Sequence, residues 1–307
     1  MTDIIMIGAG PSSLTAAVYT TREDIGTVIY EKEAIGGLVA ITDKVDNYPG
    51  FPDGIEGYLL AQQLEKQAKR FGAQIEYGKV DSIRDEGRYK VVTVDGNEVK
   101  AKAVLIATGS SYNKINIPGE AEYYGKGVHY CATCDGAFYK GKRLAVVGGG
   151  NSAIQEAIYL TGFASHIDLL VRSSIKASDV LQKKLRQVID NGKITIHVET
   201  ATNEIVATDG HVDSVLVTEK GQSGTIYVDG VFIFAGLKPN TAFLDGSGIG
   251  LDKAGFIKTD LNLQTNIPGI FASGDVRMGA TMQIASAVGE GATAAHSIRE
   301  YLKSLED

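Results

Sequence analysis

A glycine-rich turn between an apolar strand and a helix occurs twice in this chain, and this repeat constrains the fold most. The first copy is GAGPSS at 8–13, after an apolar run at 3–7, and the second is GGGNSA at 148–153, after 144–147. In each copy the first glycine allows a tight turn and the second lets a pyrophosphate approach the backbone. The helix N-terminus that follows binds phosphate through its free N–H groups. The sequence therefore predicts two dinucleotide-binding βαβ units.

The C-terminal part of the chain indicates how the two units are connected. Residues 256–307 contain a buried strand that ends near Asp275 and then a long helix, but no glycine turn of the same kind. We therefore expect this tail to complete the sheet of the first unit. The predicted fold is α/β, with two Rossmann-like three-layer dinucleotide-binding domains, the second inserted in the first. The predicted domains are 1–112 plus 240–307, and 113–239.

The two cysteines of the chain form a CxxC motif between the two glycine turns. Cys131 and Cys134 are followed at once by Asp135. Two intervening residues let a tight turn bring both sulfurs within disulfide distance, and the thiol pKa in such pairs is commonly lowered. The neighbouring acid is placed to give or take a proton. The preferred hypothesis is a redox-active pair.

A zinc site and a static disulfide are the two other roles open to the cysteine pair. A structural zinc site needs about four ligands, and the five histidines form no cluster that would supply the rest. A static disulfide is rare in a cytosolic protein. His129, two residues before Cys131, is able to lower a thiol pKa, but packing or solvent exposure is the commoner role of such a histidine.

The two predicted nucleotide sites differ at the end of their second strand. Glu31 lies 23 residues after Gly8, where a carboxylate accepts hydrogen bonds from ribose hydroxyls. The residue 23 positions after Gly148 is Val171. Arg172 follows it directly, and Lys176 lies four positions further on. An arginine pairs with a 2′-phosphate that a carboxylate would repel. The second site is therefore expected to prefer NADPH over NADH.

Composition and charge narrow the class of protein further. The chain is 44% hydrophobic and 22% charged, with a net charge of −7, so a nucleic-acid partner is not expected. No apolar run approaches the about 20 residues that span a membrane. The first apolar run begins without the basic segment that precedes it in a signal peptide. We expect a cytoplasmic protein.

These motifs resemble, in the same order, those of the low-molecular-weight, bacterial-type thioredoxin reductases, which are FAD-dependent pyridine nucleotide-disulphide oxidoreductases. The similarity covers essentially the whole chain. The matching segments are 8–13, TG at 108–109, CATCD at 131–135, 148–153 and FASGDV at 271–276. The resemblance implies FAD in the first domain, NADPH in the second, a homodimer, and thioredoxin or a similar small disulfide protein as substrate.

The resemblance also implies roles for individual residues. Cys134 would face the flavin, Cys131 would attack the incoming disulfide, and Asp135 would exchange a proton with the leaving thiol. The expected FAD contacts are Gly8, Gly10, Pro11, Ser12, Glu31, Gly37, Asn47, Thr108, Gly109, Asp275, Gln283 and Ile284. The expected NADPH contacts are Gly148, Gly150, Asn151, Ser152, Arg172 and Lys176.

One departure from the family pattern leaves the electron donor open. The family has His-Arg-Arg after the second strand and another arginine four residues on, whereas this chain has VRS at 171–173 and then Lys176. NADH or ferredoxin are therefore alternative donors, although the intact turn at 148–153 disfavours ferredoxin. A peroxiredoxin-type partner or a small disulfide is an alternative substrate. A non-enzymatic redox sensor that binds flavin or NADP is the alternative outside enzymes.

Overall fold

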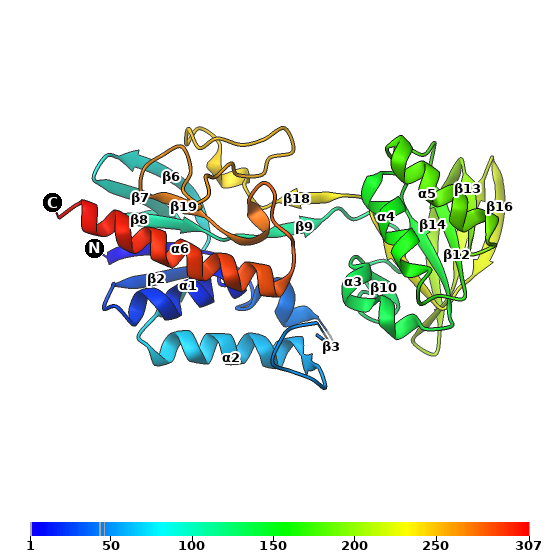
Figure 1. Ribbon diagram of the computed structural model, residues 1–307, viewed down its shortest axis with the longest axis horizontal. Helices are drawn as coiled ribbons and strands as arrows, with labels where there is room; N and C mark the ends of the chain where they lie inside the picture. Colours follow the sequence, from blue (N-terminus) through cyan, green and yellow to red (C-terminus); the bar gives the residue numbers. More distant parts are fainter. Residues whose placement is uncertain (1, 43, 46, 307) are drawn as a thin grey trace. The chain divides into compact units, whose positions relative to one another are not determined.

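The computed structural model divides the chain into two compact units. The described residues are 2–42, 44–45 and 47–306. One unit contains the chain up to Ser111 and again from Lys238 onward, and the other is Tyr112–Leu237. Two short strands, β9 (Ser110–Tyr112) and β18 (Leu237–Pro239), connect the units and pair with each other (Figure 1). The second unit is thus an insertion in the first.

The first unit is built on a seven-stranded sheet whose central strands are parallel. Its strands are β1 (Thr2–Ile7), β2 (Thr27–Glu31), β5 (Gln74–Tyr77), β6 (Val80–Glu86), β7 (Tyr89–Val94), β8 (Asn97–Ile106) and β19 (Ile270–Ala272). The long strand β8 pairs in parallel with β1 and β19 and antiparallel with β7. β2 and β5 continue the parallel part beyond β1, and β6 continues the antiparallel part beyond β7.

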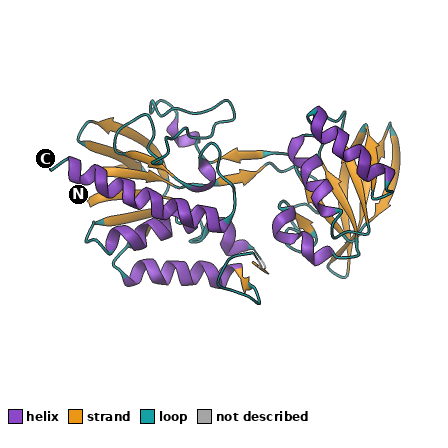
Figure 2. Ribbon diagram, viewed as in Figure 1, coloured by secondary structure: helices purple, strands orange, loops and turns teal. Residues whose placement is uncertain are grey.

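Successive side chains of the parallel strands point to opposite faces of the sheet, and this divides the core of the first unit into two layers. Ile4 and Met6 pack with helices α1 (Pro11–Thr21) and α6 (Ile284–Ser304), whereas Ile5 packs on the opposite face, toward β6 and β7. This alternation is expected of a strand that is buried on both faces. Helices α1 and α6 cover the same face of the sheet (Figure 2). The remaining elements are β3 (Lys44–Val45), β4 (Ile55–Glu56), α2 (Gly57–Arg70) and the 3₁₀ helices at Gly37–Ile41, Ala242–Leu244 and Gly274–Val276.

The second unit repeats this plan with a five-stranded parallel sheet in the order β10-β17-β11-β12-β13. Its elements are β10 (Val128–His129), α3 (Ala132–Asp135), a 3₁₀ helix (Gly136–Tyr139), β11 (Arg143–Val147), α4 (Asn151–Leu160), β12 (His166–Val171), α5 (Asp179–Asp190), β13 (Ile194–Val198) and β17 (Gly230–Ile233). A second, antiparallel sheet consists of β14 (Thr200–Thr208), β15 (His211–Glu219) and β16 (Gln222–Tyr227).

The parallel sheet of the second unit lies between helices and the antiparallel sheet. Leu144 and Val146 of β11 pack with α4 and α5, whereas Ala145 between them packs with β14 and β15. In the second unit, helices, a parallel sheet and an antiparallel sheet therefore form three layers. The predicted α/β class, with two Rossmann-like dinucleotide-binding folds, is confirmed. Among the described residues, no helix has the length and apolar character needed to cross a membrane.

Candidate active site

The two cysteines form a disulfide in the second unit. The Cα atoms of Cys131 and Cys134 are 5.3 Å apart. Cys131 is the N-cap residue of α3, and the backbone N–H of Cys134 points to its Sγ at 3.2 Å. A single helical turn therefore brings the sulfurs together, as the two-residue spacing predicts. Neither cysteine is fully buried.

The acid after the CxxC motif is held by a histidine. Asp135 Oδ2 lies 3.1 Å from His129 Nδ1, and His129 Nε2 lies 2.7 Å from the hydroxyl of Tyr139. The His129 ring also packs against Phe232, with ring centroids 5.1 Å apart. His129 thus packs, as expected from the sequence, but it also contacts the candidate proton donor.

The first glycine turn lies at the carboxyl end of β1. Gly8 has a φ of +92°, and a Cβ there would lie 2.7 Å from the carbonyl oxygen of Ala107. Ser12 Oγ is 2.6 Å from Ser273 Oγ, which joins the start of α1 to the segment after β19. Gly10 has a φ of −79°, and no described atom lies within 4 Å of the place a Cβ would take. This open space at a helix N-terminus fits a pyrophosphate group.

Further residues expected to contact FAD are brought together in pairs from distant parts of the chain. A Cβ on Gly37 would lie 3.9 Å from the Cα atom of Gly10. Asn47 Nδ2 donates a hydrogen bond to Gln283 Oε1 at 3.1 Å, immediately before Ile284 begins α6. These residues come from three separate segments of the first unit, and the fold brings Gly37 beside Gly10 and Asn47 beside Gln283.

Two carboxyl groups stand in different environments in this unit. Glu31 accepts the backbone N–H groups of Ala9 at 2.7 Å and Glu33 at 2.8 Å, one on each oxygen. Each oxygen keeps a lone pair for a ribose hydroxyl. Burial, with Glu290 nearby, raises the pKa of Asp275 to about 6. A carboxyl in this environment suits a neighbouring hydroxyl, which both donates and accepts hydrogen bonds.

Two residues that are not among the expected cofactor contacts help to fix the positions of Asp275 and Thr108. Glu290 on α6 accepts the N–H of Gly274 at 2.7 Å and pairs with Arg277 at 2.6 Å, which holds the segment that carries Asp275. Asn240 exchanges hydrogen bonds with Thr108, both at 2.8 Å, at the turn that continues through Gly109. Both contacts join parts of the chain that are distant in sequence, so no local pattern indicates them.

The two glycines of the second turn differ in the same way as Gly8 and Gly10: the first permits the tight turn and the second leaves open space. Gly148 has a φ of +143°, and a Cβ there would lie 2.6 Å from the carbonyl oxygen of Phe234. Gly150, with a φ of −88°, has no described atom within 4 Å of the place its Cβ would take. The turn therefore offers a second open helix N-terminus, at the start of α4, that fits a pyrophosphate.

The predicted 2′-phosphate residues lie in a loop tied to this turn. The backbone N–H of Lys176 donates to the carbonyl of Gly149 at 2.7 Å, and Asn151 Oδ1 accepts the N–H of Ser178 at 2.8 Å. Arg172 and Lys176 are exposed, as is Ser152 in the first turn of α4. Within the described part of the chain, neither basic side chain makes a hydrogen bond or ion pair. Both are thus available to an anion beside the turn.

The geometry of the second turn predicts unequal costs for alanine at its two glycines. We expect Gly148→Ala to lower the Tm by about 5–10 °C, because a positive φ and a backbone clash cost about 1–3 kcal/mol. Gly150→Ala is the matched control, with ordinary φ and free space, and should leave the Tm within about 2 °C. Differential scanning calorimetry of the three proteins decides, and equal Tm values would contradict this geometry.

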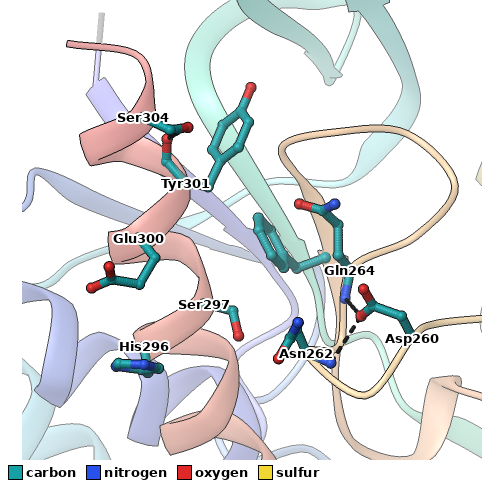
Figure 3. Close-up of a pocket in the computed structure, with 9 residues that line it drawn as sticks. Asp260, Asn262, Gln264, His296, Ser297, Glu300, Tyr301 and Ser304 are labelled. Carbon is teal, nitrogen blue, oxygen red and sulfur yellow. Dashed lines mark hydrogen bonds between the residues drawn. The ribbon is translucent and has the colours of Figure 1, made fainter. Parts of the chain in front are cut away.

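A shallow groove of about 330 Å³ lies elsewhere in the first unit, between the C-terminal half of α6 and a loop before β19 (Figure 3). Asp260 folds this loop by accepting the N–H groups of Asn262 and Gln264, both at 2.9 Å. None of the described residues that line the groove is an expected cofactor contact. Across the described residues, no three His, Cys, Asp or Glu side chains cluster so that they could hold a metal ion.

Comparison with known proteins identifies the family. Residues 2–291 match the model of the pyridine nucleotide-disulphide oxidoreductases. The chain belongs to this family. It is 42% identical to a thioredoxin reductase of Bacillus subtilis, over 99% of this chain and 96% of that protein. The crystal structure of thioredoxin reductase from Streptococcus pyogenes matches with a TM-score of 0.93 at 40% identity, covering 99% of both chains. Thioredoxin reductase from Giardia duodenalis matches with a TM-score of 0.91 at 31% identity, covering 98% of this chain and 99% of that one.

Membership of this family confirms the resemblance to thioredoxin reductases that the motifs indicated. The protein is an oxidoreductase with a redox-active disulfide, so the prediction of an enzyme is confirmed over the alternative of a non-enzymatic sensor. The family also implies a flavin and a nicotinamide cofactor, and the two open helix N-termini fit two such groups.

Proposed function

We propose that this protein is an NADPH-dependent thioredoxin-disulfide reductase. The observation that carries the proposal is the Cys131–Cys134 disulfide, followed by Asp135, in a chain that also has two glycine turns suited to dinucleotides. FAD is assigned to the predicted domain 1–112 plus 240–307, and NADPH to the predicted domain 113–239. When bound, these cofactors supply the two-electron chemistry that reduces the disulfide.

The residues of the chain bind and orient the cofactors. With both cofactors bound, the turns at Gly10 and Gly150 would hold the two pyrophosphates, Glu31 would accept hydrogen bonds from ribose hydroxyls, and Asp275 would bond a hydroxyl of the flavin side chain. Arg172, with Lys176, would pair with the 2′-phosphate. The support for these roles is the open space at both turns and the unpaired basic side chains described above.

The reduced cysteine pair then exchanges with the substrate disulfide. The Cys131 thiolate attacks one sulfur of thioredoxin, which gives a mixed disulfide and one thioredoxin thiolate. Cys134 attacks Cys131 in turn, restores the enzyme disulfide and releases the second thioredoxin thiolate. The two protons of the enzyme thiols end on the two thioredoxin thiols. Asp135 moves a proton to or from the leaving sulfur.

Steady-state turnover tests the proposed substrate. The purified protein with NADPH should reduce oxidised thioredoxin with a higher kcat/KM than a peroxiredoxin-type partner or a small disulfide such as cystine. If the protein turned over one of the latter two preferentially, that compound would be assigned as the substrate in place of thioredoxin. The proposed cysteine chemistry would stay the same.

This chain has only part of the family's basic pattern after β12, so NADH is a second candidate donor. A substitution of Arg172 tests which nucleotide the site prefers. We expect Arg172→Glu to raise the KM for NADPH about 10- to 100-fold, because a charge-assisted phosphate contact is worth about 1.5–3 kcal/mol and repulsion adds to its loss. The KM for NADH should stay within about twofold. Arg186→Glu on α5 makes the same charge change at another exposed site and should leave both values unchanged.

Wild-type protein that uses NADH as well as NADPH, with no effect of Arg172→Glu, would contradict the assigned 2′-phosphate contact. No activity with either nucleotide would favour ferredoxin as donor. A homodimer and a cytoplasmic location complete the proposal, and the family resemblance is their support.

A further inference from the structure

We propose that His129 is a positioning residue, whose Nδ1–H holds the Asp135 carboxyl where it exchanges a proton with the cysteine pair. This inference rests on the proposed function and adds a residue to its machinery. The contact that carries it is the 3.1 Å distance between His129 Nδ1 and Asp135 Oδ2.

The imidazole is a rigid support for the carboxyl. His129 ends β10, where it is in register with Phe232 of β17. Its ring stacks on Phe232 and meets Tyr139 edge-on, with centroids 5.1 and 5.3 Å apart. The His129 side chain is 8% exposed, and that of Asp135 is 18% exposed. A buried ring held by a sheet and two aromatic side chains keeps its hydrogen-bonding direction, and orientation of this kind is what proton transfer requires.

The hydrogen-bond network selects the tautomer of the histidine. Burial, together with Asp135 and Asp229, raises the pKa of Tyr139, so its hydroxyl keeps its proton. That hydroxyl lies 2.7 Å from His129 Nε2. Because the Asp135 carboxylate only accepts, its contact with Nδ1 places the proton of a neutral His129 on Nδ1, and Nε2 then accepts from the Tyr139 hydroxyl. Tyr139, His129 and Asp135 thus form a directed chain of hydrogen bonds that ends at Asp135, the residue after Cys134.

A purely structural role makes a different prediction from a positioning role. If His129 only joined β10 to α3, its loss would lower stability and would act on every step of the reaction. If it orients Asp135, its loss should slow the cysteine-dependent step alone. Its effect should also disappear when Asp135 can no longer transfer a proton.

The test measures two half-reactions by anaerobic stopped flow. One is bleaching of the bound flavin by NADPH, and the other is oxidation of the reduced enzyme by thioredoxin. We expect His129→Phe, which keeps an aromatic ring but no N–H, to slow the thioredoxin step at least about 10-fold. The initial rate of bleaching should stay within about twofold. His129→Asn places an amide N–H near the position of Nδ1 and should restore more than half of the wild-type rate. His166→Phe at the start of β12 is the matched control, with no expected effect on either step.

A double-mutant cycle separates positioning from structure. In an Asp135→Asn background, adding His129→Phe should change the thioredoxin step by less than about twofold. A full additional loss in that background would overturn the proposal, as would a wild-type rate for His129→Phe or an Asn variant as slow as the Phe variant. If His129→Phe does not fold, Tyr139→Phe decides: a slower thioredoxin step supports the proposal, and an unchanged rate overturns it. A wild-type enzyme that does not reduce thioredoxin refutes the proposed function instead.

Discussion

Cys134→Ser is expected to abolish thioredoxin reduction while the flavin is still bleached by NADPH. Cys131 and Cys134 are the only cysteines of the chain, and they are bonded to each other. Without Cys134 the mixed disulfide has no internal thiol to resolve it, so turnover should fall by at least about 1000-fold. Stopped-flow bleaching and steady-state thioredoxin reduction, measured on the same preparation, check both parts.

Cys131→Ser is the companion variant and separates the two cysteines. It removes the proposed attacking thiol, so no mixed disulfide with thioredoxin should form. Cys134→Ser, once reduced, should instead trap a covalent adduct with thioredoxin through Cys131, detectable by mass spectrometry. An adduct through Cys134, or turnover by either variant near the wild-type rate, would contradict the assigned roles.

Valine at the second glycine of each turn should remove one cofactor and leave the fold intact. Gly10 and Gly150 have ordinary φ values and free space around the position of a Cβ. A side chain there occupies the space that a pyrophosphate needs and displaces its contacts with the helix N-terminus. Losing several charge-assisted hydrogen bonds, each worth about 1.5–3 kcal/mol, should weaken binding at least about 100-fold.

The two variants serve as controls for each other. Gly150→Val should be purified with its flavin but should need at least about 100-fold more NADPH for half-maximal bleaching. Gly10→Val should be purified without flavin and should still bind NADPH in calorimetric titration. Loss of flavin from Gly150→Val, or unchanged NADPH binding by it, would contradict the assignment of FAD and NADPH to their units.

The glycine turns were predictable because their requirements are local. A strand, a tight turn and a helix N-terminus follow one another in the chain, so the pattern at 8–13 reports its own geometry. The cysteine pair is local in the same way, since one turn of α3 brings Cys131 and Cys134 together. The insertion of the second unit was also predictable, because the tail lacks a glycine turn and has to complete an existing sheet.

Contacts that depend on strand order and helix packing could not be predicted from the sequence. The Ser12–Ser273 hydrogen bond joins residues 261 positions apart, and it exists because β19 pairs with β8 beside β1. The His129–Asp135 contact spans six positions, but it needs both the register of β10 with β17 and the turn of α3. Sequence spacing alone could not distinguish a histidine that contacts the acid from one that faces solvent.

The stoichiometry of a single reaction tests the central claim most directly. Wild-type protein is mixed anaerobically with NADPH and an excess of oxidised thioredoxin, and NADPH oxidation and new thioredoxin thiols are measured together. Electron transfer through the Cys131–Cys134 pair predicts two thioredoxin thiols for each NADPH consumed, and Cys134→Ser should produce neither at a catalytic rate. NADPH consumption without new thioredoxin thiols, or thiols formed equally well by Cys134→Ser, would contradict the account.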